Sequence, residues 1–540
     1  MNRKIWKALG IAVCMLALAA PRAMAETHVH TVTADTNFAE VVKTINASKD
    51  EGEHVIELYD DITLTGNYTL TNGKTTTIKG KEGEDRKISI NGSNDPNAGI
   101  TVTGEKTTLN LGVNGYDKKL TIEGDTGVAF ITVSGGATAN MYENVTLQNR
   151  QSTGNACIVI MGSKSVFNMH GGVIENCSRA VTADSGTTFN MSGGEIRNCK
   201  GGSGNGGGVR VYGATFVMSG GTISGCSASN GGGLCAEKSS TVTISGGTIS
   251  GCTAEVGGGL YATNQSTITI NKGTISGCKA LSSDKGNGGG LYVEGSTLTI
   301  ERGTISGCTA RNNGGGLYAT NSSTNSSIVN ISGGTISGCK GLLGGGLYAD
   351  NSAITINNGT ISGCEAVFGN GGGLYVNNST IEISDGTIKG NEATFSGGGL
   401  YVVGSTLNIK KGGTISECTA AMNEGGGLYA DNSTVTISGG TISGCKAQSS
   451  GKGNGGGLYA KNKSTITIDN GTISECDGRW GGGLYADNSA VTINNCTISG
   501  CRAGAGGGLF VNNGSTLNIK DGTISKCFVS DTGKGGGLYA

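Results

Sequence analysis

Cysteine is the residue type in this chain whose side chains are most suited to chemistry, either as disulfides or as metal ligands. Thirteen of the seventeen cysteines recur once per repeat, each three residues after an isoleucine. They are Cys177, Cys199, Cys226, Cys252, Cys278, Cys308, Cys339, Cys364, Cys418, Cys445, Cys476, Cys501 and Cys527. Stacked residues on parallel strands point the same way, which suits a disulfide torsion poorly, so we favour a buried thiol stack over a disulfide ladder. A metal site has less support, because no Cys-x-x-Cys pair or Cys/His cluster occurs.

Some positions depart from the cysteine pattern. Asn391 replaces the cysteine in one repeat, which suits an inward turn position where a small polar side chain bonds to the backbone. Cys235 stands at a position that is tyrosine elsewhere, and Cys496 shares a repeat with Cys501. We expect these three cysteines to behave differently from the rest.

A column of aromatic residues is the strongest hint of function in the sequence. An aromatic residue follows the leucine of most glycine-rich blocks, at Tyr261, Tyr292, Tyr318, Tyr348, Tyr375, Tyr401, Tyr429, Tyr459, Tyr485, Phe510 and Tyr539. The first repeat has Arg210 there, between Val209 and Val211, which indicates that the position faces out. We expect an outward stripe that stacks on sugar rings or packs against a partner protein. The alternative is that the rings only stabilise neighbouring strands by pairing.

The carboxylates give little support to catalysis. A glycosidase needs two of them about 5 to 9.5 Å apart. Asp350 and Asp431 stand three repeats apart, and Lys461 stands between Asp431 and Asp487, which indicates a neutralised charge stack.

The four histidines also resemble no catalytic set. His28, His30 and His54 precede the repeats, and His170 takes the place of Ser192 in the next repeat, as a surface variant would. We therefore expect no catalytic residue, no cofactor and no metal. Polysaccharide lyases and hydrolases nevertheless share the fold derived below, and the irregular part of the chain has room for such a site.

A long repeat must position these side chains. Three glycines and then an aliphatic residue recur thirteen times, with the aliphatic residue at 209, 234, 260, 291, 317, 347, 374, 400, 428, 458, 484, 509 and 538. The period of 25 to 31 residues is typical of a solenoid. We expect the glycines at corners, where φ above zero is needed and where side chains would collide with adjacent coils.

One unit, from residue 433 to 460, contains three short pieces with strand periodicity. Residues 434–437, 441–443 and 458–460 each alternate inward apolar residues with outward ones, at a period of two. Three such strands joined by turns make one coil of a parallel β-helix. The sequence therefore predicts an all-β fold, a single right-handed parallel β-helix with three strands per coil.

The chain divides into four predicted parts. Residues 1–25 have a basic start, an apolar stretch and a small-x-small site, as in a secretory signal peptide. Residues 26–54 are predicted to form an N-terminal cap with a helix at about 36–48. Residues 55–205 are predicted to form irregular coils, and residues 206–540 regular glycine-rich coils without a C-terminal cap. Irregular strands are expected at 55–58, 70–78, 88–90, 120–122 and 167–169.

The segment before each glycine block varies in length and composition. It carries Leu342-Leu343, Val367-Phe368, Phe395, Met422 or Arg479-Trp480. Variable loops on a fixed scaffold are common binding sites. An equally favoured alternative to binding is that an apolar residue in this segment fills the corner of its own coil.

Charge and hydropathy exclude several classes of partner. The formal net charge is −1, with 39 basic and 40 acidic residues and no long run of either sign, so nothing draws the chain to nucleic acid or anionic lipid. Beyond residue 25 no apolar stretch approaches the roughly 20 residues of a membrane helix. We expect a mature chain that is extracellular or at the cell surface, with no membrane-spanning segment.

One repeat carries a family resemblance. Residues 390–393, Gly-Asn-Glu-Ala, followed by residues 397–401, Gly-Gly-Gly-Leu-Tyr, resemble the repeat of chlamydial polymorphic membrane proteins and related adhesin-like β-helix proteins. The resemblance covers about residues 200–540, with Cys where that family usually has Asn. It implies an extracellular adhesive or structural surface without known chemistry. It does not extend to the membrane β-barrel of those proteins, so it gives no outer-membrane anchor.

Together these features predict an exported, non-enzymatic, adhesin-like or structural surface protein. Its expected partner is an extracellular glycan or a host or matrix protein. The alternative is a secreted polysaccharide lyase or hydrolase of the pectin-lyase-like β-helix type.

Overall fold

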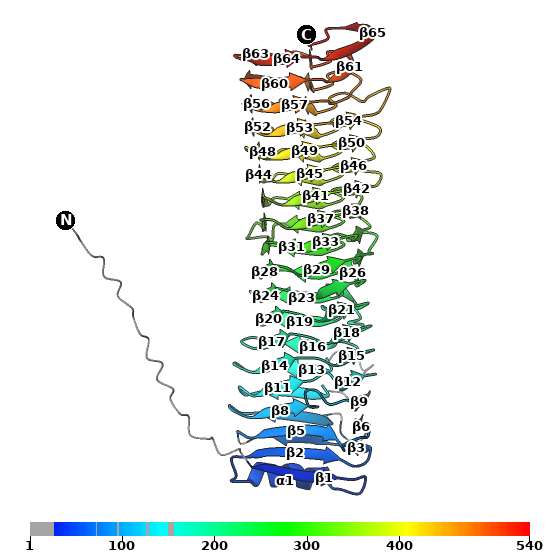
Figure 1. The fold of residues 1–540 in the computed structure, drawn as a ribbon, viewed down its shortest axis with the longest axis vertical. Helices are drawn as coiled ribbons and strands as arrows, with labels where there is room; N and C mark the ends of the chain where they lie inside the picture. Colours follow the sequence, from blue (N-terminus) through cyan, green and yellow to red (C-terminus); the bar gives the residue numbers. More distant parts are fainter. Residues whose placement is uncertain (1–25, 72, 94, 96, 126–128, 150–155) are drawn as a thin grey trace, which may run out of the picture.

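The computed structural model describes residues 26–71, 73–93, 95, 97–125, 129–149 and 156–540. Over these residues the chain forms one straight column of about 18 stacked turns, and the sequence rises steadily from one end to the other (Figure 1). The predicted signal peptide lies outside the described residues.

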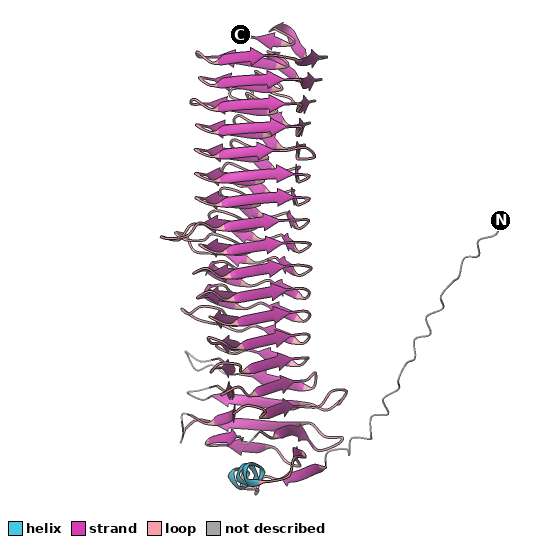
Figure 2. Ribbon diagram, turned by 90° about the vertical axis from the view of Figure 1, so that its left-hand side faces the viewer, coloured by secondary structure: helices cyan, strands magenta, loops and turns pink. Residues whose placement is uncertain are grey.

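Three long parallel sheets run along the column within the described residues. In the coil that starts at Leu428, β52 (Thr434–Ser438) belongs to the first sheet, β53 (Thr441–Ser443) to the second and β51 (Leu428–Asp431) to the third; we call them sheets A, B and C. Each strand pairs in parallel with its equivalent in the next coil, β56 (Thr465–Asp469), β57 (Thr472–Ser474) or β55 (Leu458–Lys461). Figure 2 shows these strands stacked like rungs. The three principal strands per coil agree with the prediction.

A fourth, shorter sheet, which we call sheet D, has no counterpart in the prediction. Nine coils contribute a short strand directly after the cysteine position, from β22 (Ser227–Asn230) to β54 (Lys446–Ala447). β61 (Arg502–Ala505) and β65 (Phe528–Lys534) form a separate pair further up. The segment after the cysteine is therefore wrongly predicted as loop throughout. Its polar-alanine pairs are too short for a period of two to be recognised.

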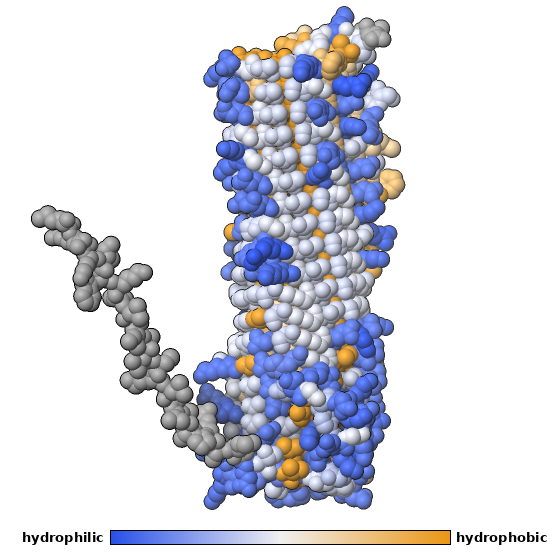
Figure 3. Space-filling model, viewed as in Figure 1, coloured by the Kyte–Doolittle hydropathy of each residue, from blue (hydrophilic) through white to orange (hydrophobic). Residues whose placement is uncertain are grey.

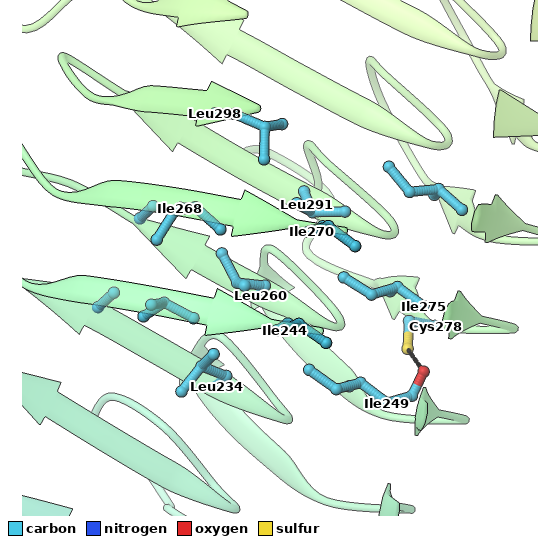
Figure 4. Packing of buried hydrophobic residues seen from close by; sticks show 14 of the residues in the cluster. Leu234, Ile244, Ile249, Leu260, Ile268, Ile270, Ile275, Cys278, Leu291 and Leu298 are labelled. Atoms are coloured by element: carbon cyan, nitrogen blue, oxygen red, sulfur yellow. Dashed lines mark hydrogen bonds between the residues drawn. The ribbon is translucent and has the colours of Figure 1, made fainter. Parts of the chain in front are cut away.

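The core is a continuous apolar column enclosed by the sheets. Leu428, Val435, Ile437 and Ile442 have no exposed surface, and the parallel register places each beside its equivalent in the next coil. Figure 4 shows this packing lower in the column, where isoleucines of sheets A and B meet leucines of sheet C. Full burial of each such side chain contributes about 1.5–3 kcal/mol.

The glycine triplets make the corner before sheet C, as predicted. Gly455, the first of one triplet, has φ +64°, which is costly for other residues. The second and third glycines of the triplet are required for a different reason. A Cβ on Gly456 would lie 2.3 Å from the carbonyl oxygen of Asp477, and one on Gly457 would lie 2.5 Å from that of Gly483, both in the next coil. The backbones of neighbouring coils thus approach each other too closely for any side chain.

The N-terminal region starts the column with a strand that the sequence pattern does not reveal. β1 (Thr27–Val32) pairs with β2 (Glu53–Leu58), and α1 (Phe38–Ala47) lies between them in the chain. The predicted helix is confirmed. The Asn37 side chain accepts a hydrogen bond from the amide of Ala39 at 3.1 Å and so caps it. Figure 2 shows the helix at one end of the column; a capping role stays a prediction.

The irregular coils contain strands at each predicted place. The predicted segment 70–78 divides into two strands separated by a turn. The strands are β2, β4 (Asn67–Leu70), β5 (Thr75–Gly80), β6 (Arg86–Asn91), β9 (Leu120–Asp125) and β14 (Val166–Met169).

Candidate functional site

The predicted aromatic column is a continuous stack on the outer side of sheet C. The parallel register places each ring directly over the next. Adjacent ring centroids lie 4.5 to 5.2 Å apart, and adjacent ring planes differ by 3 to 22°. We call this stack, from Tyr261 to Tyr539, the tyrosine ladder.

The ladder points away from the interior, but it is far less exposed than an open stripe. From Tyr261 to Tyr485 its rings alternate with fully buried leucine and alanine or valine, so the predicted direction is correct. Tyr429, Tyr459 and Tyr485 are only 3 to 6 % exposed, and with Phe510 they form an apolar cluster outside the main core. The lower rings, from Tyr261 to Tyr401, are half-buried.

Stacking also decides what the ladder can offer to a ligand. Each ring between Tyr292 and Phe510 has a neighbour on both faces. No face is left there on which a sugar ring could stack, so stacking on sugars, the first of the two binding modes expected from the sequence, does not fit these rings. The ladder presents ring edges and phenol hydroxyls instead.

A polar column runs beside the ladder, at the position two residues after the ring, with Val403 as its one apolar member. Tyr261 Oη donates to Glu294 Oε2 at 3.2 Å, and Tyr459 Oη donates to Asp487 Oδ2 at 3.4 Å. Asn512 Nδ2 donates to Tyr485 Oη at 3.1 Å. Hydroxyl, carboxylate and amide groups therefore lie side by side along the same surface.

The predicted charge stack in this polar column forms in register, but without a direct ion pair among the described residues. Asp431 and Lys461 are neighbours in register, yet no ion pair joins Lys461 to Asp431 or Asp487 in the described part of the chain. The Lys461 ammonium lies instead 5.8 Å from the centre of the Tyr429 ring. Asp431 accepts a hydrogen bond from Asn462 Nδ2 at 2.7 Å. The cation thus favours the aromatic surface over its acidic neighbours.

Burial keeps the phenols protonated. It raises the pKa of Tyr401 to about 12, and it raises those of Tyr318 and Tyr375 together with the nearby Asp350 carboxylate. Loss of the proton would leave a phenolate with little hydration against a neighbouring ring. The hydroxyls of Tyr318, Tyr375 and Tyr401 are therefore neutral over the physiological pH range.

Below Tyr261 the aromatic column ends on two different side chains. Arg210 and Cys235 occupy the same register position in the two preceding coils. Arg210 Nε lies 2.9 Å from Glu237 Oε2, and burial raises the pKa of the Cys235 thiol. Cys235 thus lies on the outer side of sheet C, apart from the cysteine column.

The cysteine column is a stack of thiols that are buried up to Cys501, as favoured from the sequence. From Cys199 to Cys527 the cysteines are free, and each thiol donates to the carbonyl two residues earlier at 3.2 to 3.5 Å. Figure 4 shows the second partner of Cys278, the carbonyl of Ile249 at 3.9 Å. The hydrogen bond with the Cys252 thiol, together with burial, raises the pKa of Cys278 to about 12.

Cys177 departs from this stack. It forms a disulfide with Cys157, one coil earlier, so its prediction as a free member is wrong. Cys157 lacks the repeat context, and its position gave no signal for the pairing. Cys496, which shares a repeat with Cys501, is buried, and burial raises its pKa to about 11.

Comparison with known protein families assigns the fold. The sequence profile of the family described as right handed beta helix region matches residues 156–332 and 385–540, more than half of the chain. The chain belongs to the right-handed β-helix family. The match also supports the predicted hand of the coils. No curated protein matches this β-helix, and no solved structure does.

Asn391 behaves in this β-helix as the sequence predicts. Its side chain is buried, its Nδ2 donates to the carbonyl of Ile361 at 3.0 Å, and its Oδ1 accepts from the amide of Cys364 at 2.8 Å. The amide thus replaces the thiol by bonding to the backbone of the coil below.

The histidines separate into one surface residue and one cluster. His170 is exposed, lies against Tyr142 and has Nδ1 3.3 Å from Ser192 Oγ, as a surface variant would. His28, His30 and His54 come together across β1 and β2, which the sequence does not reveal because β1 is not recognised. Among the described residues no group of three or more His, Cys, Asp or Glu is placed to hold a metal ion. Nor does any described helix have the length and apolar character needed to cross a membrane.

The variable segments fall into two kinds. Leu342, Phe368 and Met422 are 39, 74 and 56 % exposed, so they do not plug their corners. Figure 3 shows apolar groups standing among hydrophilic ones along one edge of the β-helix. Trp480 is half-buried and stacks on Phe510 with centroids 5.6 Å apart, which ties its segment to the tyrosine ladder.

Proposed function

We propose that this β-helix is an exported, non-enzymatic, adhesin-like or structural protein that acts outside the cell or at its surface. Its partner in this proposal is an extended glycan or matrix protein that lies along the tyrosine ladder. The N-terminal residues 1–25 support export, and the repeat resemblance supports an adhesive role.

One observation carries the proposal, namely that the ladder repeats without interruption from Tyr261 to Tyr539 and that polar residues flank it in every coil up to Asn512 except at Val403. At about 4.8 Å per coil this surface is on the order of 50 Å long. A ligand with a repeating unit would make the same weak contacts many times. Because the contacts are linked in one ligand, the overall affinity is much higher than that of a single contact. Ring edges, phenol hydroxyls, carboxylates and amides are suited to hydrogen-bonding a hydroxyl-rich chain.

The test is a screen of immobilised neutral and acidic polysaccharides and matrix proteins. A triple variant, Tyr318→Phe, Tyr348→Phe and Tyr375→Phe, removes three hydroxyls and keeps the stack. We expect it to weaken binding by at least about tenfold. The matched control is Thr269→Val, Thr299→Val and Thr436→Val on the outer side of sheet A, which should bind as the natural chain does.

Two outcomes would overturn the proposal. Unchanged binding by the phenylalanine variant, or no binding at all, would leave the ladder with only its stacking role. New reducing ends or unsaturated products from any polysaccharide would favour the lyase or hydrolase alternative.

A further inference from the structure

The side of the column that carries sheet D is interrupted near its upper end. Two short segments, 477–480 and 502–505, lie between the longer segments 446–454 and 528–534. A hollow of 460 Å³ lies between the first longer segment and residues 477–479, and one of 240 Å³ lies between residues 477–478 and the segment from Phe528. They share Asp477 and Gly478, and we call them together the loop notch. In Figure 1 the segments that border it belong to the coils of β54, β61 and β65.

The floor of the notch consists of small residues, which explains why it stays open. Ala447, Gly478, Ala503 and Gly504 line it, and Ala447 and Ala503 are buried. Regular sheet D pairing stops here, and only single bridges join Lys446, Asp477 and Arg502. A Cβ on Gly478 would lie 2.8 Å from the amide nitrogen of Gly456, so a side chain cannot fill the space.

The charges of the notch are not paired with each other. Lys446, Asp477 and Arg502 stack in one register column, and lower in the same column Lys340 and Glu365 form an ion pair at 2.6 Å. Within the described residues no ion pair involves Lys446, Asp477 or Arg502. Their exposed side chains are therefore available to a ligand.

A third cation is held in place beside them. The Arg479 guanidinium lies 4.3 Å from the centre of the Trp480 ring, and its Nη1 donates to the carbonyl of Gly451. Lys446, Arg479 and Arg502 thus line the two hollows, and Asp477 is the one carboxylate among the described lining residues, in a chain whose net charge is −1. This local excess favours an anionic ligand, and a guanidinium binds a carboxylate through two parallel hydrogen bonds.

The other residues that line the loop notch indicate which class of anionic ligand suits it. Gln448, Ser449 and Ser450 line the lower hollow with amide and hydroxyl groups. Phe528, 58 % exposed, follows Arg502 in the same column and borders the upper hollow. Unlike the ladder rings, Phe528 has no aromatic neighbour within the described residues. Cations, hydroxyl-binding groups and an accessible ring together suit an acidic sugar.

We propose that the loop notch binds a carboxylate-bearing sugar unit. Lys446 and Arg502 take the carboxylate, Asp477 and Gln448 bind hydroxyls, and Phe528 covers the apolar face of the ring. This inference shares with the proposed function the idea of a glycan partner, but it does not depend on the tyrosine ladder.

The test uses trigalacturonate as the acidic probe, with maltotriose as the neutral one, and calorimetry on the whole chain. Lys446→Gln together with Arg502→Gln should raise the Kd for trigalacturonate by at least about tenfold. Lys279→Gln, in the same column but outside the notch, is the matched control and should not change it. Maltotriose should bind far more weakly than trigalacturonate.

Several results would overturn this inference. They are no binding of trigalacturonate, equal weakening by Lys279→Gln, or equally tight binding of a hexaglutamate peptide, which would make the notch a peptide site. Unchanged hydrogen exchange in residues 446–534 shows that the double variant is folded. The ladder variant with Tyr318, Tyr348 and Tyr375 changed to Phe should keep trigalacturonate binding, so that failure of one proposal is distinguishable from failure of the other.

Discussion

His30 Nε2 lies 3.1 Å from His54 Nδ1, across the contact between β1 and β2. One imidazole must donate and the other accept, so the bond requires at least one neutral ring. The His28 ring stacks on His54 at 5.2 Å, and His54 is only 2 % exposed. His28 Nε2 lies 3.7 Å from Asp50 Oδ2, the nearest carboxylate to this cluster.

We predict that acid loosens the first coil. Burial lowers the pKa of His30 and of His54, and the neighbouring imidazoles lower both further. Because the folded pKa lies below the unfolded value of about 6.5, the stabilisation is complete above that pH and is lost as the pH falls through the folded pKa. Hydrogen exchange, corrected for the intrinsic effect of pH, should therefore accelerate in residues 27–58 between about pH 7.5 and pH 5, and not in the regular coils.

Two variants check that the cluster is responsible. His54→Phe keeps the stacking on His28 and removes the buried titrating group, so the acid effect should shrink. His170→Gln changes an exposed histidine and should leave the acid effect as it is. An acid effect of unchanged size in His54→Phe would contradict this assignment.

The second prediction concerns the middle glycine of a triplet. Gly456→Ala places a Cβ 2.3 Å from the Asp477 carbonyl oxygen, whereas Gly451→Ala has Ser449 Oγ at 4.0 Å as its nearest neighbour. We expect Gly456→Ala to cost about 2–4 kcal/mol and Gly451→Ala to be nearly neutral. Hydrogen exchange of the coils around residues 428–484 measures the local loss. Equal protection in both variants would refute the close-approach explanation.

The sequence predicts those features of the fold that arise from a local pattern, most of them repeated from coil to coil. The period of two in residues 434–437, the glycine corners and the inward amide of Asn391 each follow from a local pattern with an unambiguous physical meaning. Features that depend on contacts between coils are harder to predict. The pairing of Cys157 with Cys177 and the histidine cluster depend on register in coils that lack the repeat.

The exposure of the tyrosine ladder shows a different limit of sequence analysis. The alternation of Leu458, Tyr459 and Ala460 gives the direction of the ring correctly. It does not give the spacing of about 5 Å at which the neighbouring rings cover each face. Sheet D is likewise hidden, because two-residue strands such as β54 gain their identity only from the coils beside them.

The third prediction tests the one amide in the cysteine column. Asn391→Ala leaves the Ile361 carbonyl and the Cys364 amide without their partners inside the core. We expect a cost of about 2–4 kcal/mol, because each unsatisfied buried group costs about 1–3 kcal/mol. Asn391→Cys restores the side chain of the other coils and should cost less than about 1.5 kcal/mol. Faster exchange in residues 361–418 should distinguish the two, and equal rates would contradict the role of the amide bonds.

The fourth prediction concerns thiol reactivity. Cys527 is half-buried, whereas the stack from Cys199 to Cys501 is buried. Thiolate is the reactive form, and the reagent must also reach it; the stack thiols from Cys199 to Cys501 are at most 1 % exposed, so the stack should resist alkylation at about pH 8. We expect iodoacetamide to label Cys527 first in the native protein, and the remaining free cysteines only after denaturation. Mass spectrometry of labelled peptides measures the order, and Cys527→Ser should remove the fast phase. Rapid native labelling of Cys252 or Cys278 would show that the column opens, which the continuous packing of the core argues against.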